Sequence, residues 1–255
     1  MIYKYFIANT LFNSSFDRFI PGFLRKNFIK KKRLYYVPTN LKFLPEKNYT
    51  ILSNIDHHIK VINQFNQSSN EVVKTKSFPT MIELLKKLYT SDCKFSFLDY
   101  GGEEIDQYLV LKKEFKNINY FLINQKQINN DFRFLINKYN FSNFFIVDKE
   151  EDLLNFEYDF VNFGSVIQYI SNYQSTLNIV LKKSKKYVLF SGVIFFVDAL
   201  NEVIIVKQLN MWPTKLYSHF INYRKFIQTL KENNFNLNFE KENNTNLINF
   251  DNHEL

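Results

Sequence analysis

The sequence predicts an α/β protein with a Rossmann-like, mainly parallel sheet and helices on both faces. From residue 94 onward, short apolar runs alternate with helix-like stretches, and the connections between them are short. Glycines follow two of these apolar runs, at 101–102 and at 164. Strand, helix and strand in succession are typical of βαβ units, which place their strands side by side in parallel. Consecutive late strands then predict an antiparallel C-terminal edge.

The individual elements follow from apolar spacing. Met81, Leu84, Leu85 and Leu88 recur at the spacing of one helix face, and Pro79 stands just before them, so the spacing predicts a helix over 80–92. Further helices are expected at 104–116, 129–140, 172–184 and 222–234, with a short helical piece at 150–156. Strands are expected at 94–100, 119–124, 143–148, 158–164, 186–196 and 202–209, with 235–241 as a candidate last strand.

This pattern divides the chain into three parts. Residues 1–78 form a basic, mostly helical N-terminal extension, within which 51–78 is polar and ambiguous. Residues 79–241 form the Rossmann-like domain, and residues 242–255 form a polar tail.

Composition excludes several protein classes. Of the 255 residues, 45% are hydrophobic and 18% aromatic, which excludes a globally disordered chain. One cysteine excludes an intramolecular disulfide and a site built from several cysteines. The four histidines show no metal-ligand spacing with a carboxylate, which disfavours a zinc enzyme. No apolar run suits a transmembrane helix and no signal peptide is evident, so we expect a cytoplasmic protein.

The whole basic excess lies in the first fifty residues. They hold ten Lys/Arg and two acids, which accounts for the net charge of +8, and the other 205 residues sum to zero. Four phenylalanines at helical spacing precede the cluster Lys30–Arg33, so residues 12–33 suit an anionic membrane surface. The alternative is a helical hairpin packed on the main domain. Nucleic acid is disfavoured as a partner, because a protein that binds it generally spreads basic residues over its fold.

Three strand ends carry the candidate ligand-binding residues. After the first strand come Asp99 and the pair Gly101-Gly102, which open a helix. Glycines let the backbone approach a ligand, and a helix N-terminus offers amide donors to an anion. Asp99 either holds a ligand ammonium or braces the loop. The second strand ends in Asn124-Gln125, where a ribose-binding acid is common, and the fourth ends in Gly164-Ser165.

Taken in order, these segments resemble class I S-adenosylmethionine-dependent methyltransferases, and above all a bacterial family linked with surface-polysaccharide gene clusters. The matching pieces are Leu98-Asp99-Tyr100-Gly101-Gly102, Ile123-Asn124-Gln125, Gly164 to Ile170, and Val206-Lys207-Gln208 before Trp212-Pro213. The resemblance covers roughly residues 78–240 and implies S-adenosylmethionine as the cofactor. It implies cofactor contacts by Asp99, Gly101, Gly102, Asn124, Gln125, Gly164 and Ser165.

Two departures from the family pattern bear on this site. Glu103 and Glu104 stand where the family continues with glycines, and Asn124 replaces the ribose-binding acid. The resemblance as a whole implies a methyltransferase acting on a small-molecule, saccharide or lipid-linked saccharide acceptor. The alternative is a non-catalytic protein of the same fold that serves as a binding or membrane-peripheral partner. A nicotinamide-dependent enzyme is disfavoured because a spaced G-x-G-x-x-G is absent.

Methyl transfer needs an aligned acceptor, and a base only where a hydroxyl must lose its proton. His219 and Tyr169 are the catalytic candidates. We expect His219 in a loop between the last strong strand and its helix. The adjacent His57 and His58 point different ways on any regular element, which disfavours a shared metal.

Overall fold

The computed structural model describes residues 36–45, 54–67, 79–197, 202–208 and 216–238. These residues fall into two compact units. One comprises the described residues within 51–167 and 174–193. The other comprises the described residues within 1–50, 168–173 and 194–255.

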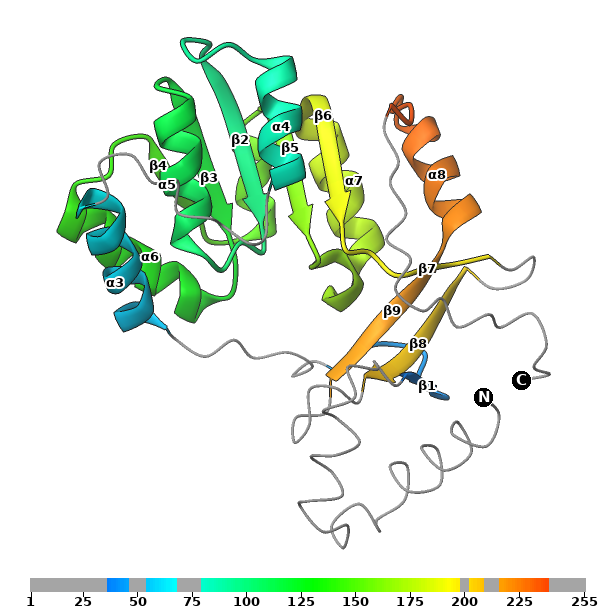
Figure 1. Cartoon of the computed structure of the whole chain (residues 1–255). Helices are drawn as coiled ribbons and strands as arrows, with labels where there is room; N and C mark the ends of the chain where they lie inside the picture. The colour runs from blue at the N-terminus through cyan, green and yellow to red at the C-terminus, as the bar shows by residue number, and fades with distance from the viewer. Residues whose placement is uncertain (1–35, 46–53, 68–78, 198–201, 209–215, 239–255) are drawn as a thin grey trace, which may run out of the picture. The chain divides into compact units, whose positions relative to one another are not determined.

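The first unit is built on a five-stranded sheet in the order β4-β3-β2-β5-β6 (Figure 1). Its strands are β2 (Phe95–Tyr100), β3 (Ile118–Ile123), β4 (Phe144–Val147), β5 (Tyr158–Gly164) and β6 (Ser184–Ser191). Every neighbouring pair is parallel. The predicted fold class is confirmed. The bounds of β2 to β5 agree with the predicted strands to within one residue, whereas β6 begins two residues before the predicted strand 186–196 and ends five residues before its end.

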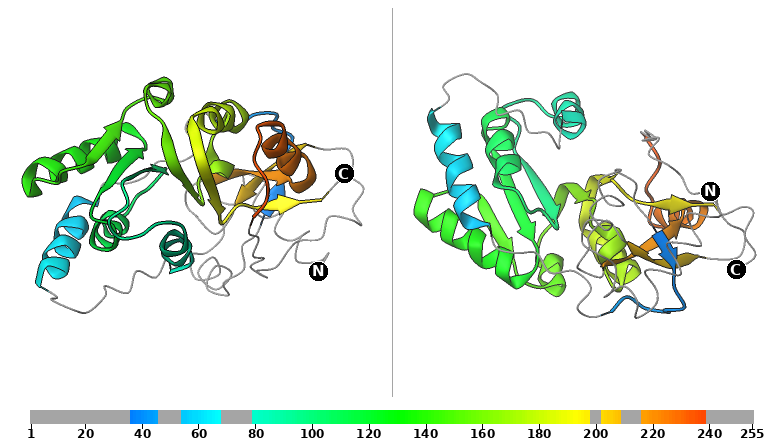
Figure 2. Two further views of the ribbon diagram at one scale, coloured as in Figure 1. Left: turned by 90° about the horizontal axis from the view of Figure 1, so that it is seen from above. Right: turned by 60° about the horizontal axis from the view of Figure 1, so that its bottom comes forward.

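Helices lie on both sides of this sheet (Figure 2). They are α3 (Ile55–Gln67), α4 (Pro79–Leu88), α5 (Ile105–Glu114), α6 (Lys126–Tyr139) and α7 (Tyr173–Lys183), with the short 3-10 helix η2 (Glu150–Asn155). Pro79 occupies the first position of α4, where its missing N–H removes no intrahelical bond. The polar stretch before it contains α3, which the sequence left ambiguous. Ile55, Ile59 and Ile62 form its apolar stripe against the core.

Aromatic rings stack across neighbouring strands on both faces of the sheet. On one face Phe97 stacks on Tyr120 of β3 and on Phe160 of β5, with ring centroids 5.4 and 5.5 Å apart. On the other face Phe163 lies between Tyr100 and Phe190, at 4.9 and 5.2 Å. Parallel register places each of these rings beside its neighbour, so the high phenylalanine content supplies cross-strand pairs.

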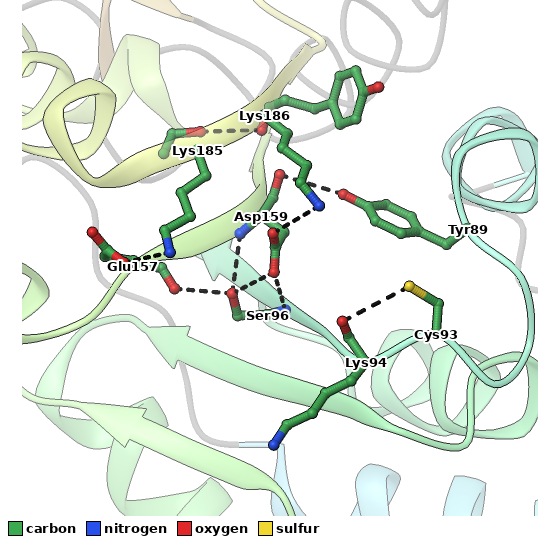
Figure 3. A network of polar contacts seen from close by, with 10 residues as sticks. Tyr89, Cys93, Lys94, Ser96, Glu157, Asp159, Lys185 and Lys186 are labelled. Atoms are coloured by element: carbon green, nitrogen blue, oxygen red, sulfur yellow. Dashed lines mark hydrogen bonds and ion pairs between the residues drawn. The ribbon is translucent and has the colours of Figure 1, made fainter.

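The amino ends of β2, β5 and β6 are joined by a polar network (Figure 3). Asp159 accepts hydrogen bonds from the Ser96 amide at 3.0 Å and from its hydroxyl at 3.1 Å, and Lys186 forms an ion pair with it at 3.2 Å. Burial raises the pKa of Asp159, but the Ser96 bonds and the Lys186 ammonium outweigh it, so the pKa is lowered overall. Beside it lies the exposed pair Lys185–Glu157. This end of the sheet, opposite the predicted ligand edge, is stabilised by ion pairs and by hydrogen bonds to the Asp159 carboxylate.

The second unit contains a four-stranded sheet in the order β1-β8-β9-β7. Its elements are β1 (Tyr36–Pro38), β7 (Phe195–Phe196), β8 (Val203–Gln208), β9 (Leu216–Asn222) and α8 (Tyr223–Glu232). The late strands β8 and β9 pair antiparallel, in this separate sheet. The predicted strand 186–196 is divided at Gly192, whose φ of +64° turns the chain between β6 and β7.

Three further differences concern the C-terminal part. β9 was not predicted, and it carries His219 within a strand rather than in the expected loop. Residues 235–238 form no strand, so the candidate last strand is wrong over its described half. Residues 12–33 with their basic cluster, the segment 209–215 and the tail 242–255 lie outside the described residues. Among the helices described, none is long and apolar enough to cross a membrane.

Candidate functional site

The connectivity of the five-stranded sheet places its switch point between β2 and β5. From β2 the chain runs outward through β3 to β4, and it then returns to add β5 and β6 on the other side. In open parallel sheets, ligands bind beyond the carboxyl ends of the strands at this point. The residues after β2, β3 and β5 are therefore the candidate site.

The turn after β2 requires glycine at both of its positions. Gly101 has a φ of +79°, and a Cβ there would lie 2.5 Å from Cγ2 of Val166. A Cβ on Gly102 would lie 1.9 Å from Oδ2 of Asp99. The Gly101 amide donates to the Ile123 carbonyl at 2.8 Å, which ties the turn to the end of β3. These glycines are explained by close packing within the chain itself.

Asp99 lies beneath this turn and is 2% exposed. Its Oδ2 accepts a hydrogen bond from the Tyr120 hydroxyl at 2.6 Å, and its Oδ1 accepts one from the Asn162 amide at 3.0 Å. Burial raises the pKa of Asp99, and the hydrogen bonds from Tyr120, Asn162 and Gln107 oppose that rise. Of the two roles the sequence left open for Asp99, the contacts favour bracing the loop.

Asn124 connects the ends of β2 and β3. Its Nδ2 donates to the Gly102 carbonyl at 2.7 Å, and its Oδ1 accepts from the Gln125 amide at 2.7 Å. Its own backbone amide donates to Oδ1 of the buried Asn129 at 3.1 Å. A carboxylate at position 124 has no proton to donate to Gly102. The asparagine thus fits a bond within the chain that the expected acid could not make.

Two helices begin at this edge without side-chain caps. The N-cap of α5 is Glu104 and that of α6 is Gln125, and neither side chain makes a capping hydrogen bond. The first amides of a helix need a partner and attract anions. Glu104 and Asp106 place carboxylates at the same end of α5. Burial, together with the neighbouring acids, raises the pKa of Glu104, although His57 lies 3.7 Å from it.

Gly164 and Ser165 end β5 beside this turn. Outside its chain neighbours and within the part of the chain that the structure describes, a Cβ on Gly164 would meet only Nδ2 of Asn162, at 3.4 Å. Ser165 has a φ of +54°, and its amide donates to the Ser191 carbonyl at 2.7 Å. A Cβ on Gly192 would lie 2.0 Å from the Ser165 hydroxyl. Gly164 is thus the glycine here that leaves room for a ligand.

The two catalytic candidates lie in the other unit. The Tyr169 hydroxyl donates to Gln208 Oε1 at 2.9 Å, and burial raises the pKa of Tyr169. His219 is 4% exposed in β9, with the Tyr173 ring at 5.2 Å. Burial lowers its pKa to about 4. Its Nδ1 has no hydrogen-bond partner among the described residues.

The structure thus brings seven of the nine candidate residues to one edge of the sheet: Asp99, Gly101, Gly102, Asn124, Gln125, Gly164 and Ser165. Sequence reasoning missed Tyr120, Asn162 and Asn129, which support them. Asn162 had a detectable signal, because it is a polar residue within the otherwise apolar end of a strand. In the described part of the chain, no group of histidine, cysteine and acidic residues could hold a metal ion.

No protein-family model matches the chain, and no curated protein matches it. Among solved structures, the chain is similar to the N-terminal domain of EvdMO1 with SAH bound, at 9% identity, 71% coverage of this chain, 87% of that chain, and a TM-score of 0.46. It is similar to the Burkholderia thailandensis 1,6-didemethyltoxoflavin-N1-methyltransferase with bound 1,6-didemethyltoxoflavin and S-adenosylhomocysteine, at 9% identity, 79% and 84% coverage, and a TM-score of 0.43. An O-methyltransferase family protein from the same organism gives 10% identity, 83% and 62% coverage, and a TM-score of 0.46. At these values the likenesses assign no activity to this chain, and its fold class follows from its own strand order and register.

Proposed function

We propose that this protein is an S-adenosylmethionine-dependent methyltransferase. The observation that carries the proposal is the N-terminus of α5, which has no side-chain cap and begins just after the glycine turn at the switch point of the sheet. The ordered motif resemblance in the sequence supports the same cofactor. The similar solved structures that contain S-adenosylhomocysteine agree with the proposal, but the proposal does not rest on them.

The residues at this edge fit such a cofactor in three respects. The amides at the start of α5 suit its methionine carboxylate, and Gly164 leaves room for close approach. Gln125, at the start of α6, presents an amide that can bond ribose hydroxyls. When bound, S-adenosylmethionine supplies an electrophilic methyl group. The chain's own contribution is to hold that group and to align the acceptor, which accounts for most of the catalysis of such a transfer.

For the acceptor, we propose a hydroxyl of a saccharide or lipid-linked saccharide, on the sequence resemblance alone. The acceptor oxygen would form its bond to the methyl carbon as the carbon–sulfur bond breaks, and its proton would pass to a base. We propose His219 as that base and Tyr169 as the second catalytic residue. Burial lowers the pKa of His219 to about 4, so it is unprotonated at neutral pH, the form in which a base acts, and it is a weaker base than a free imidazole.

A second candidate function is supported by Asn124. Its side chain is an uncharged amide and is engaged with Gly102 and Gln125. It therefore offers the ribose no charged acceptor. Glu104 and Asp106 also oppose a ligand carboxylate at the start of α5. These features favour a non-catalytic binding protein that keeps the fold.

Calorimetric titration of the full chain with S-adenosylmethionine and S-adenosylhomocysteine separates the two. We expect dissociation constants on the order of micromolar for a working cofactor site. Absence of binding up to millimolar ligand would overturn the proposal and leave the binding-protein function. With binding established, single-turnover transfer to saccharide acceptors tests the acceptor. His219→Gln must then lower the transfer rate without changing cofactor affinity.

A further inference from the structure

Two hydrogen-bond donors converge on the carboxylate beneath the glycine turn, and a third donor supports one of them. Gln107 of α5 donates to the Tyr120 hydroxyl at 3.3 Å, Tyr120 donates to Oδ2 of Asp99, and Asn162 donates to Oδ1. Because both carboxylate oxygens accept, the arrangement fits the ionised form of Asp99. Four elements, α5, β3, β2 and β5, thus meet at one buried carboxyl group.

That carboxylate supports the turn directly. The position of a Cβ on Gly102 lies 1.9 Å from Oδ2 and 2.5 Å from Cγ of Asp99, so the Gly102 backbone rests on the carboxyl group. The preceding amide, that of Gly101, reaches across to the Ile123 carbonyl. A rotation of the Asp99 side chain would collide with Gly102 or leave space beneath it. The conformation of the turn therefore depends on the orientation of this one carboxylate.

We propose that Tyr120 and Asn162 are positioning residues of the cofactor turn, which act by fixing Asp99 beneath Gly102. The proposal relies on the proposed function for the identity of the ligand, but the position of the turn can be measured without any ligand. Asp99 itself is then a support for the turn, since each of its oxygens already accepts a hydrogen bond, from Tyr120 and from Asn162.

The chain offers a matched control for removing the Tyr120 hydroxyl. Tyr108 is a buried tyrosine of α5 whose ring lies 5.4 Å from that of Tyr120, and its hydroxyl donates to the Ser142 carbonyl at 3.2 Å. Tyr108→Phe and Tyr120→Phe each delete one buried hydroxyl in the same layer. The deletion at Tyr120 is the one that frees Asp99.

The first measurement is hydrogen exchange of the Gly101 amide in the ligand-free full chain. We expect Tyr120→Phe to accelerate this exchange about tenfold relative to the amide of Leu98 in β2, since a hydrogen bond to a charged group is lost. Tyr108→Phe should leave the ratio within about twofold. Equal effects of the two variants would overturn the proposal.

The second measurement is the affinity for S-adenosylmethionine as a function of pH. The groups that face the Asp99 carboxylate are Tyr120 from β3, Asn162 from β5 and Gln107 from α5, and Asp106 of α5 faces the Tyr120 phenol. Loss of the Tyr120 donor lets Asp99 take up a proton at higher pH. We therefore expect Tyr120→Phe to weaken binding about tenfold. We also expect the loss of affinity on acidification to begin at a higher pH than in the parent protein. An unshifted onset, at unchanged affinity, would contradict the positioning role.

The two arms separate the two possible failures. If the parent protein binds no S-adenosylmethionine, the proposed function fails, and the exchange of Gly101 still decides whether Tyr120 positions the turn. Asn162→Leu removes the other donor and should reproduce the exchange effect. If the parent binds the cofactor and Tyr120→Phe changes neither exchange nor affinity, the positioning role fails and the function stands.

Discussion

The side-chain amide of Asn124 donates to the backbone carbonyl of Gly102 over 2.7 Å. This bond joins the residue that follows β3 to the glycine turn that follows β2. It explains an amide at the place where the related fold commonly has an acid. It also makes the behaviour of several variants predictable.

Replacing Asn124 with Glu should weaken the cofactor site. The substitution removes the proton given to Gly102 and places a carboxylate against a carbonyl oxygen. We expect a loss of affinity for S-adenosylmethionine of at least about tenfold and a loss of stability of about 1–3 kcal/mol. Titration calorimetry and urea unfolding measure both.

Asn117 provides the control, since its Nδ2 donates to the Asp92 carbonyl at 2.9 Å on the exposed surface, after α5. Asn117→Asp should leave cofactor affinity unchanged. A rise in affinity of Asn124→Glu would mean that position 124 faces the ribose after all.

Two glycines of the edge, Gly101 and Gly164, should differ in whether alanine disturbs the packing of the chain or only the approach of a ligand. Gly101→Ala forces a side chain onto a φ of +79° and against Val166, so we expect a loss of about 1–3 kcal/mol of stability. Gly164→Ala meets one atom at 3.4 Å and should change stability by less than about 0.5 kcal/mol. If the cofactor passes over Gly164, its affinity must nevertheless fall. Unchanged affinity in Gly164→Ala would place the ligand elsewhere.

His219 should make stability depend on pH in the mildly acidic range. Its folded pKa of about 4 lies below the ordinary value near 6.5, so the unfolded chain binds this proton more tightly. Stability is therefore full above pH about 6.5 and declines as pH falls toward 4, by up to about 3 kcal/mol. Urea unfolding of the parent and of His219→Gln at several pH values tests this. The variant should lose that part of the slope, and an identical slope in both proteins would count against the buried neutral form.

The network at the amino end should lose stability in the same direction, as pH falls, but at lower pH than His219. The pKa of Asp159 is lowered, so its contribution to stability is present above the ordinary carboxyl pKa and is lost as pH falls through the folded value. Asp159→Asn removes the ion pair with Lys186 and should cost about 1–3 kcal/mol at neutral pH. Glu157→Gln breaks the adjacent exposed pair with Lys185 and should leave the unfolding midpoint where it is. Equal shifts in the two variants would show that Ser96 adds nothing to the Asp159 site.

The basic leader leads to a prediction about membranes. Replacing Lys30, Lys31, Lys32 and Arg33 with alanine in the full chain should abolish sedimentation with phosphatidylserine vesicles, because the first fifty residues carry the whole net charge. Neutral phosphatidylcholine vesicles serve as the comparison. Equal sedimentation of parent and variant would exclude electrostatic membrane contact through residues 12–33.

The parallel sheet was predictable because each of its strands is an apolar run bounded by a turn. β5 was placed at its observed bounds, Tyr158–Gly164, since Gly164 ends it. β9 was missed because the polar residues Ser218 and His219 interrupt its apolar run. A second reason is that its burial depends on pairing with β8. β1 has three residues, too few for any period to be detected.

The candidate site was predictable in place and less so in detail. Glycines after a strand mark the edge, so Gly101, Gly102 and Gly164 were found. What the sequence could not tell is which polar side chains face inward. Asp99 and Asn162 lie 63 residues apart in the chain and become neighbours only through the register of β2 and β5.

The stack of Tyr100, Phe163 and Phe190 has a consequence for motion. Phe163 is fully buried between two rings that belong to neighbouring strands. A half-turn of its ring sweeps a volume that close packing does not provide, so it can occur only while β2, β5 and β6 briefly separate. The flip rate of the Phe163 ring can be measured from the exchange broadening of its ring protons. It therefore reports the rate at which the strands separate locally at the switch point of the sheet.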